Sequence, residues 1–211
     1  IGLGIAMISF IYSITNTTAA ITLLCLAAMP FFTALLAFLF LKEKISLNVW
    51  ISMLIAAVGI IIMAVGNSEK NSLIGFVFGL TSSIGFSIFS VTLRWRKETP
   101  KFTTVAVAGL FCFITATIMI LLNKQTFFAN SYNSAMFSLH GVLVCLGLIL
   151  YSIGSKAIQA AELTLLSLTE VIGGIFWVWL PLFGINEIPS TNTIVGGFFL
   201  FISLIYYSLI M

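Results

Sequence analysis

The sequence predicts an all-α membrane protein, a multi-pass helical bundle of two inverted repeats with eight helices present of an expected ten. Three observations predict this fold class: an apolar composition, a series of apolar runs long enough to cross a bilayer, and an internal repeat. Of the 211 residues, 61% are hydrophobic and 7% are charged, against about 25% charged in an average soluble domain. A surface of that composition would aggregate in water, so lipid is the expected solvent.

The composition also excludes several functional classes. Every acidic residue is Glu, and the chain has one His and three scattered cysteines, so we expect neither a metal site nor a disulfide framework. The motif G-x-x-x-x-G-K-[ST] does not occur, which excludes ATP binding through a P-loop. The net charge of +3 is small and dispersed, which argues against nucleic acid as a partner. No cofactor is expected.

Eight apolar runs define the expected helices, because a bilayer-spanning helix needs about 20 mostly apolar residues. In chain order the runs cover 1–14, 19–41, 45–65, 72–93, 103–122, 135–154, 163–183 and 193–211. The second to the eighth are each long enough to cross. The first is short and begins without Met. We interpret it as a span that continues upstream, since it lacks the basic region and cleavage site of a signal peptide.

The distribution of basic residues predicts the direction of the runs. Alternate connections lie on opposite sides of the membrane. One side carries seven basic residues, and the other carries Lys70 and Lys124; the seven are Lys42, Lys44, Arg94, Arg96, Lys97, Lys101 and Lys156. The positive-inside rule places the seven in the cytoplasm. The first run then points outward and the C-terminus is cytoplasmic. We expect the protein in the cell membrane, as in a bacterial inner membrane.

An internal repeat follows two of the runs. The spacing E-x2-S-x5-small-x6-small occurs twice, and each member lies 144 residues from its counterpart: Glu43, Ser46, Ser52 and Gly59, then Glu187, Ser190, Gly196 and Ser203. Upstream, the triplet Tyr-Ser-Ile occurs at 12–14 and again at 151–153. The matches keep the same order along the chain, which makes coincidence an unsatisfactory explanation.

Counting runs between the two copies predicts their relative orientation. The second and seventh runs are five steps apart, and an odd number of steps reverses the direction through the membrane. This is the inverted-topology repeat of many secondary transporters. We expect residues 1–66 to be the remainder of the first repeat, with three helices, and residues 72–211 to be the second, with five. Two helices and part of a third are expected upstream of Ile1.

The two copies resemble the end of the EamA repeat of the drug/metabolite transporter superfamily. The first reads A-M-P-F-F from Ala28 and L-K-E-K around Glu43, and the second reads L-T-E-V-I-G-G around Glu170 and N-E-I-P-S around Glu187. Lys42 and Asn186 stand where the family has Gly before Glu. The resemblance implies alternating access and a midplane solute cavity lined by the first, second, fourth, sixth and seventh runs and one further helix.

Glu170 is the charged residue deepest within a run, seven residues into 163–183. A charged side chain at mid-bilayer costs at least about 2.5–3.5 kcal/mol, so such residues usually face a cavity or a partner. One interpretation is a carboxylate that contacts the solute or couples its transport to protons. The other is a protonated or hydrogen-bonded Glu that fastens its helix to neighbouring helices. The sequence leaves both open.

Further candidates for the solute path are a proline, two tryptophans and several hydroxyl groups. Pro30 lies mid-run and predicts a kink, which either lines the path or only shapes packing. Trp177 and Trp179 lie too deep for an interfacial belt and form either an aromatic wall or packing contacts. The hydroxyls of Tyr12, Tyr151, Thr81, Ser82 and Ser83 could serve a site, although most such groups bond to helix backbone.

His140, Glu43 and Glu187 lie near run ends and favour structural roles. Lone His140 is five residues into its run and is interpreted as interfacial, and the two glutamates as capping groups in solvent.

The sequence therefore predicts a secondary transporter for a small organic solute, and no enzyme, because no catalytic motif such as G-x-S-x-G or H-E-x-x-H occurs. The alternative is a non-catalytic membrane subunit or scaffold of a larger complex. Expected partners are membrane lipid, a small-molecule substrate and protons as a candidate coupling ion, with no nucleic acid. The protein is expected as a monomer or homodimer.

Overall fold

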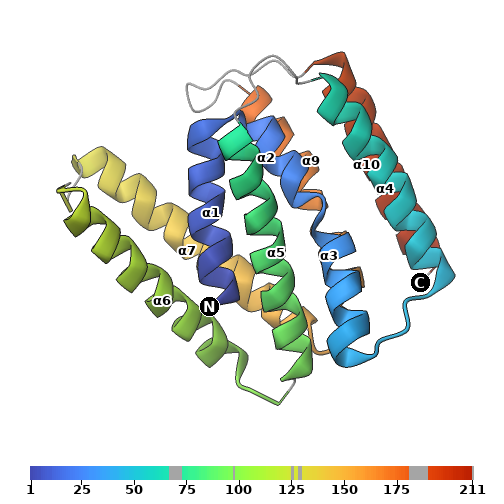
Figure 1. The fold of residues 1–211 in the computed structure, drawn as a ribbon, viewed down its shortest axis with the longest axis horizontal. Coiled ribbons are helices and arrows are strands. Elements are labelled where there is room, and N and C mark those ends of the chain that lie inside the picture. Colours follow the sequence, from blue (N-terminus) through green and yellow to red (C-terminus); the bar gives the residue numbers. More distant parts are fainter. Residues whose placement is uncertain (67–72, 97, 125, 128–129, 181–189, 211) are drawn as a thin grey trace.

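The computed structural model describes residues 1–66, 73–96, 98–124, 126–127, 130–180 and 190–210 (Figure 1). Every secondary-structure element in this part of the chain is a helix. The elements are α1 Gly2–Asn16, α2 Ala19–Leu26, α3 Met29–Leu36, the π-helix η1 Ala37–Leu41, α4 Leu47–Gly66, α5 Leu73–Trp95, α6 Lys101–Leu122, α7 Ser131–Gly154, α8 Ala160–Leu166, α9 Thr169–Trp179 and α10 Thr191–Ile210. The predicted all-α membrane bundle is confirmed.

Apolar helices of membrane-spanning length occupy most of the predicted runs. Among the described residues, five segments of sufficient length and hydropathy are Ile21–Leu41, Leu73–Trp95, Phe102–Leu122, Ser131–Gly154 and Thr191–Ile210, and shorter apolar helices are Gly2–Asn16 and Leu47–Met63. The remaining run, predicted at 163–183, is divided between α8 and α9, and its last three residues lie outside the described part of the chain.

Two of the predicted spans are each broken into two helices. The first break separates α2 from α3 at Ala27–Ala28, and the second separates α8 from α9 at Ser167–Leu168. Around the first, Ala28 N–H donates to Cys25 O (3.1 Å) and Phe31 N–H to Ala28 O (3.1 Å). Around the second, the equivalent bonds run from Leu168 to Leu165 (3.1 Å) and from Val171 to Leu168 (3.0 Å). The two breaks therefore have the same backbone geometry, 140 residues apart, and Pro30 is the counterpart of Glu170.

Different residues produce the two breaks. Pro30 has no N–H to offer the carbonyl of Leu26 four residues earlier, which ends α2, and it suits the first turn of α3. The second break has no proline. There Ser167 Oγ donates to Thr164 O (2.7 Å) and Thr169 Oγ1 donates to Leu166 O (3.0 Å), so side-chain hydroxyls compete with the backbone for these carbonyls.

The pair formed by α4 and α10 shows that the repeats are inverted. Ser203 Oγ donates to the backbone O of Ser52 (2.7 Å). The backbones of Gly59 and Gly196 approach so closely that a Cβ at Gly59 would lie 2.5 Å from Gly196 O. Seven residues forward in α4 correspond to seven residues backward in α10, so the helices are antiparallel. The counterpart of Ser52 is Gly196 and that of Gly59 is Ser203. The two contacts are thus related by a pseudo-two-fold axis across the helices.

Small residues also bring α1 and α5 together. Ser82 Oγ donates to Ala6 O (2.8 Å), and Ser13 Oγ donates to Gly75 O (2.8 Å), which makes this second pair antiparallel as well. A Cβ at Gly79 would lie 2.7 Å from Cys25 Cβ. The small residues Gly75, Gly79 and Ser82 of α5 thus allow close packing against α1 and α2.

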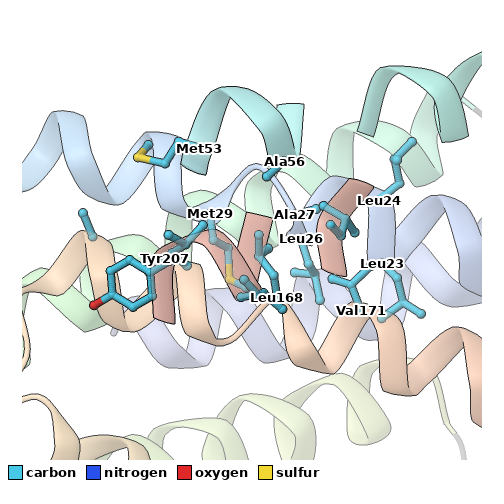
Figure 2. Close-up of a cluster of buried hydrophobic side chains, with 14 of the residues drawn as sticks. Leu23, Leu24, Leu26, Ala27, Met29, Met53, Ala56, Leu168, Val171 and Tyr207 are labelled. Carbon is cyan, nitrogen blue, oxygen red and sulfur yellow. The ribbon is translucent and has the colours of Figure 1, made fainter. Parts of the chain in front are cut away.

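The main apolar core lies where the two broken helices meet the α4–α10 pair. Figure 2 shows Leu23, Leu26 and Met29 of the first broken helix in one cluster with Leu168 and Val171 of the second. The other labelled residues are Leu24 and Ala27 of the first broken helix, Met53 and Ala56 of α4, and Tyr207 of α10. This core holds both breaks at fixed positions inside the bundle. By contrast, α6 and α7 lie together at one edge (Figure 1), and most of their side chains are exposed.

Candidate solute cavity

A cavity of about 430 Å³ opens between the helix pair α1–α5, helix α7 and the two breaks. It is lined by Ala6, Met7, Phe10, Ile11, Leu26, Met29, Ser82, Phe86, His140, Val144, Gly147, Leu148, Tyr151, Ser167 and Glu170. These residues come from the first, second, fourth, sixth and seventh predicted runs, the five that the resemblance implied. Ligand sites typically measure about 300–1,000 Å³ and are mostly apolar with a few polar groups, as this cavity is.

Glu170 brings a carboxyl group into this cavity. It is the second residue of α9, directly after the break, and its side chain is exposed toward the cavity. The first turn of a helix favours a negative charge. We find no hydrogen bond or ion pair from its carboxylate to any described residue, so nothing in this part of the chain fastens Glu170 to a neighbouring helix. The carboxylate is free to contact a small molecule.

The hydroxyl groups around the cavity are already engaged. Ser82 donates to Ala6 O, and Ser167 donates to Thr164 O. Tyr151 Oη lies 2.7 Å from Ser90 Oγ, whose own proton is directed to Phe86 O (2.9 Å). Tyr151 is therefore the donor toward Ser90. These groups shape the cavity wall, and Glu170 and His140 supply its remaining polar chemistry.

Five of the predicted site residues lie away from the cavity lining. Pro30 is buried at the first break, and Ser83 is buried with its hydroxyl donating to Cys25 O. Tyr12 stacks on Phe78 with ring centroids 5.2 Å apart. Trp177 and Trp179 are about half exposed and each contacts the Phe176 ring. The structure thus brings Glu170, Tyr151 and Ser82 together in the cavity lining and places the other five elsewhere. Thr81, also considered, donates to its own helix at Val77 O.

Two residues assigned to outer positions from the sequence have different surroundings in the structure. His140 lines the cavity, although counting along its run alone places it near the surface. Glu43 forms an ion pair with Arg94, with Nε to Oε1 at 2.8 Å and both side chains 13–15% exposed. Glu187 lies outside the described residues.

The surroundings of this ion pair join three separate parts of the chain. Arg94 also donates to the carbonyls of Ser155 (3.3 Å) and Lys156 (2.9 Å) after α7, while Ala160 N–H at the start of α8 donates to Glu43 Oε2 (3.4 Å). We call these five residues the Glu43–Arg94 cluster. It ties the π-helix end, α5 and the α7–α8 connection together, one helical turn beyond the Ser90–Tyr151 bond. No local sequence signal links Glu43 to a residue 51 positions away.

Comparison with known proteins finds similarity to one family of transporters. The EamA-like transporter family matches residues 1–65. A transporter of Clostridium kluyveri, itself named only as uncharacterized, is 24% identical over 99% of this chain and 69% of its own length. The pseudopaline exporter CntI of Pseudomonas aeruginosa is 24% identical over 96% of this chain and 70% of its own. The chain is thus similar to EamA-type transporters, and the family model itself matches the first 65 residues.

Two further similarities differ in how much of each chain they cover. An uncharacterized transporter of Helicobacter pylori is 33% identical, but the match spans 45% of this chain and only 32% of that relative's length. A solved crystal structure superposes with a TM-score of 0.73 at 16% identity, covering 100% of this chain and 75% of the other. That second similarity shows the fold alone.

Proposed function

We propose that the protein is a secondary transporter that moves a small organic solute, such as a metabolite, an amino acid or a drug, across a membrane by alternating access. The observation that carries the proposal is the cavity of about 430 Å³ lined by both repeats, with the unpaired carboxyl group of Glu170 in its wall. The family and the transporter names of the relatives support the same function. Transport between inverted halves places the solute at their interface.

The Glu43–Arg94 cluster supports a closed cytoplasmic side in this proposal. By the positive-inside rule, the end of the bundle with Arg94 and Lys156 faces the cytoplasm, which also places the C-terminus there, in the cell membrane. An inward-facing state would then require α5 to separate from the α7–α8 connection, breaking the cluster. The two helix breaks provide positions where backbone dihedrals can change during such a motion.

The driving force in this proposal is a gradient of protons or of the solute itself. Glu170 is the candidate coupling group because a carboxyl group that lines a cavity can exchange a proton with water or solute in that cavity. Replacing it with Gln removes the charge and keeps the volume. A charge-assisted hydrogen bond contributes about 1.5–3 kcal/mol, and its loss weakens binding roughly tenfold or more.

Counterflow in vesicles tests the proposal. The protein expressed from its whole gene is reconstituted with a panel of radiolabelled amino acids, amines and drugs, with and without a pH gradient. We expect saturable counterflow of at least one solute, reduced roughly tenfold by Glu170→Gln and unchanged by Glu98→Gln, which alters an exposed carboxylate in the α5–α6 connection. Absence of counterflow with the whole panel contradicts the carrier and favours the scaffold alternative. If counterflow is the same with and without the pH gradient and is unchanged by Glu170→Gln, proton coupling is contradicted but the carrier proposal is not.

A further inference from the structure

The charge of the cavity lining is unbalanced. Among the described residues that line it, Glu170 is the acidic side chain and none is Lys or Arg. The helices α1, α2, α3 and α5 contribute apolar side chains and Ser82, and the Tyr151 hydroxyl is engaged with Ser90. An ionised Glu170 therefore has no counter-ion in the described wall. Because an unpaired charge between apolar surfaces is costly, a cationic ligand there would gain more than a neutral one.

His140 and Tyr151 are the other ionisable side chains in the described lining of this cavity. His140 belongs to α7, whereas Glu170 belongs to α9. At about 1.5 Å per residue, His140 lies about 21 Å from the Gly154 end of α7, and Glu170 lies about 15 Å from the Ala160 end of α8. Gly154 and Ala160 flank one short connection, so the two positions differ in depth by about 6 Å, roughly one helical turn. A positive charge at position 140 would act on the same region of the cavity as a cationic ligand.

Aromatic and aliphatic side chains line the same cavity as the Glu170 carboxyl group. Phe10 of α1 and Phe86 of α5 line the cavity together with Met7 and Leu148, and the Phe86 ring packs edge-on against Tyr151 with centroids 5.1 Å apart. Aromatic faces attract cations as well as apolar groups. The wall thus suits a molecule with a hydrophobic body and one positive charge.

We propose that the cavity selects solutes carrying one ammonium group on an apolar body. The ammonium group donates to the Glu170 carboxylate, and the apolar body packs against Phe10, Phe86 and Leu148. This proposal rests on the proposed function and specifies its substrate class. His140 is a specificity-determining residue, because it lines the same cavity as Glu170 and a fixed cation in its place would compete with the solute.

Three probes that differ mainly in charge test the proposal: 2-phenylethylamine, 2-phenylethanol and 3-phenylpropanoate. Binding to the purified protein, expressed from its whole gene, is measured by equilibrium dialysis at neutral pH, with binding to protein-free micelles subtracted. We expect the amine to bind roughly tenfold more tightly than the alcohol, and the carboxylate to bind most weakly. Glu170→Gln should bring amine and alcohol to equal affinity, whereas Glu98→Gln should leave the preference unchanged.

A second pair of variants tests His140 without removing the carboxylate. His140→Lys places a fixed cation in the wall and should weaken amine binding roughly tenfold while sparing the alcohol. His140→Gln keeps a polar, uncharged group and should retain the preference for the amine. Equal affinity of the wild type for amine and alcohol overturns the proposal, as does an amine preference that survives both Glu170→Gln and His140→Lys. In either case, counterflow of a neutral or anionic solute would still support the transporter itself.

Discussion

Lys42 illustrates how a single residue departs from the local preference of the backbone. It follows the π-helix η1 in the left-handed conformation, with φ 55° and ψ 27°, and Glu43 N–H then closes the helix end on Ala37 O (3.3 Å). The family pattern has Gly before this Glu, and a left-handed residue after a helix is the position where Gly is preferred. Lys42 therefore adopts a conformation that Gly would adopt at lower cost.

Replacing this lysine should stabilise the protein. Lys42→Gly removes the Cβ cost of the left-handed conformation, about 1–2 kcal/mol, and adds the smaller entropy cost of glycine, so we expect a net gain of about 1 kcal/mol. Thermal unfolding in detergent would show a higher midpoint. Lys44→Gly is the matched control, since positive φ values in the described chain occur at Lys42 and Lys124 and not at Lys44. An equal gain for both variants would contradict the conformational explanation.

At the scale of helices, the α4–α10 pair depends on glycine at specific positions. At Gly196 an added methyl group would meet the backbone of Gly59 and the side chain of Met63. At the adjacent Gly197 the nearest atom, Met63 Cε, would be 3.5 Å away, an ordinary contact. Two neighbouring glycines in one helix therefore have different steric requirements.

This difference predicts opposite outcomes for two alanine substitutions. Gly196→Ala should lower the free energy of unfolding by about 1–3 kcal/mol, the usual cost of overpacking. Gly197→Ala should be neutral or slightly stabilising, because alanine has the higher helix propensity. Thermal unfolding of both variants under the same detergent conditions provides the comparison. A similar unfolding midpoint for both variants would mean that α4 and α10 can move apart at Gly196 without loss of stability.

The parts of the fold that could be predicted are those for which the sequence contains a local pattern. Apolar runs predicted helices whose ends agree with α2–η1, α5 and α6 to within two residues, and the 144-residue repeat predicted the inversion seen in α4 and α10. The first break was signalled by Pro30. The second was not, because hydroxyl groups produce it and the sequence there reads as one continuous apolar helix.

The cavity could be predicted only in part, for a related reason. Glu170 was recognisable because a charge within an apolar run is conspicuous wherever it points. His140 was assigned to the outer surface, because its position along one helix does not reveal which other helices lie beside it. The Glu43–Arg94 cluster depends on contacts between residues 51 to 117 positions apart, and hydrophobic patterning contains no information about such pairing.

For the molecule as a whole, the Glu43–Arg94 cluster should control which side of the membrane reaches the cavity. A partly exposed ion pair contributes up to about 1 kcal/mol, so Glu43→Gln should shift the population toward cytoplasmic opening roughly fivefold. Ser167→Cys, in a background without Cys25, Cys112 and Cys145, reports access to the cavity. In inside-out vesicles, Glu43→Gln should increase labelling of this cysteine by an impermeant maleimide. The control variant Glu98→Gln should leave the labelling unchanged. Unchanged labelling with Glu43→Gln would show that the cluster does not hold the cytoplasmic side closed.

The proposed orientation has its own test. A fluorescent protein fused after Met211 should be fluorescent in cells, and alkaline phosphatase fused at the same position should be inactive, because the positive-inside rule places this end in the cytoplasm. Lys156 and Arg94 lie on the same side in this arrangement. The reverse pattern of reporter activity would invert the assignment of the cytoplasmic and outer ends of the cavity.

The reciprocal contacts between α4 and α10 have a consequence for the origin of the architecture. Ser52 meets the counterpart of Gly59, and Gly59 meets the counterpart of Ser52. Two separate copies of a single half-chain, inserted upside down relative to each other, could form a similar joint, with a small residue at each of the four positions. Gene duplication and fusion of such a dual-topology ancestor would preserve this joint while the breaks diverged, one acquiring a proline and the other an acid.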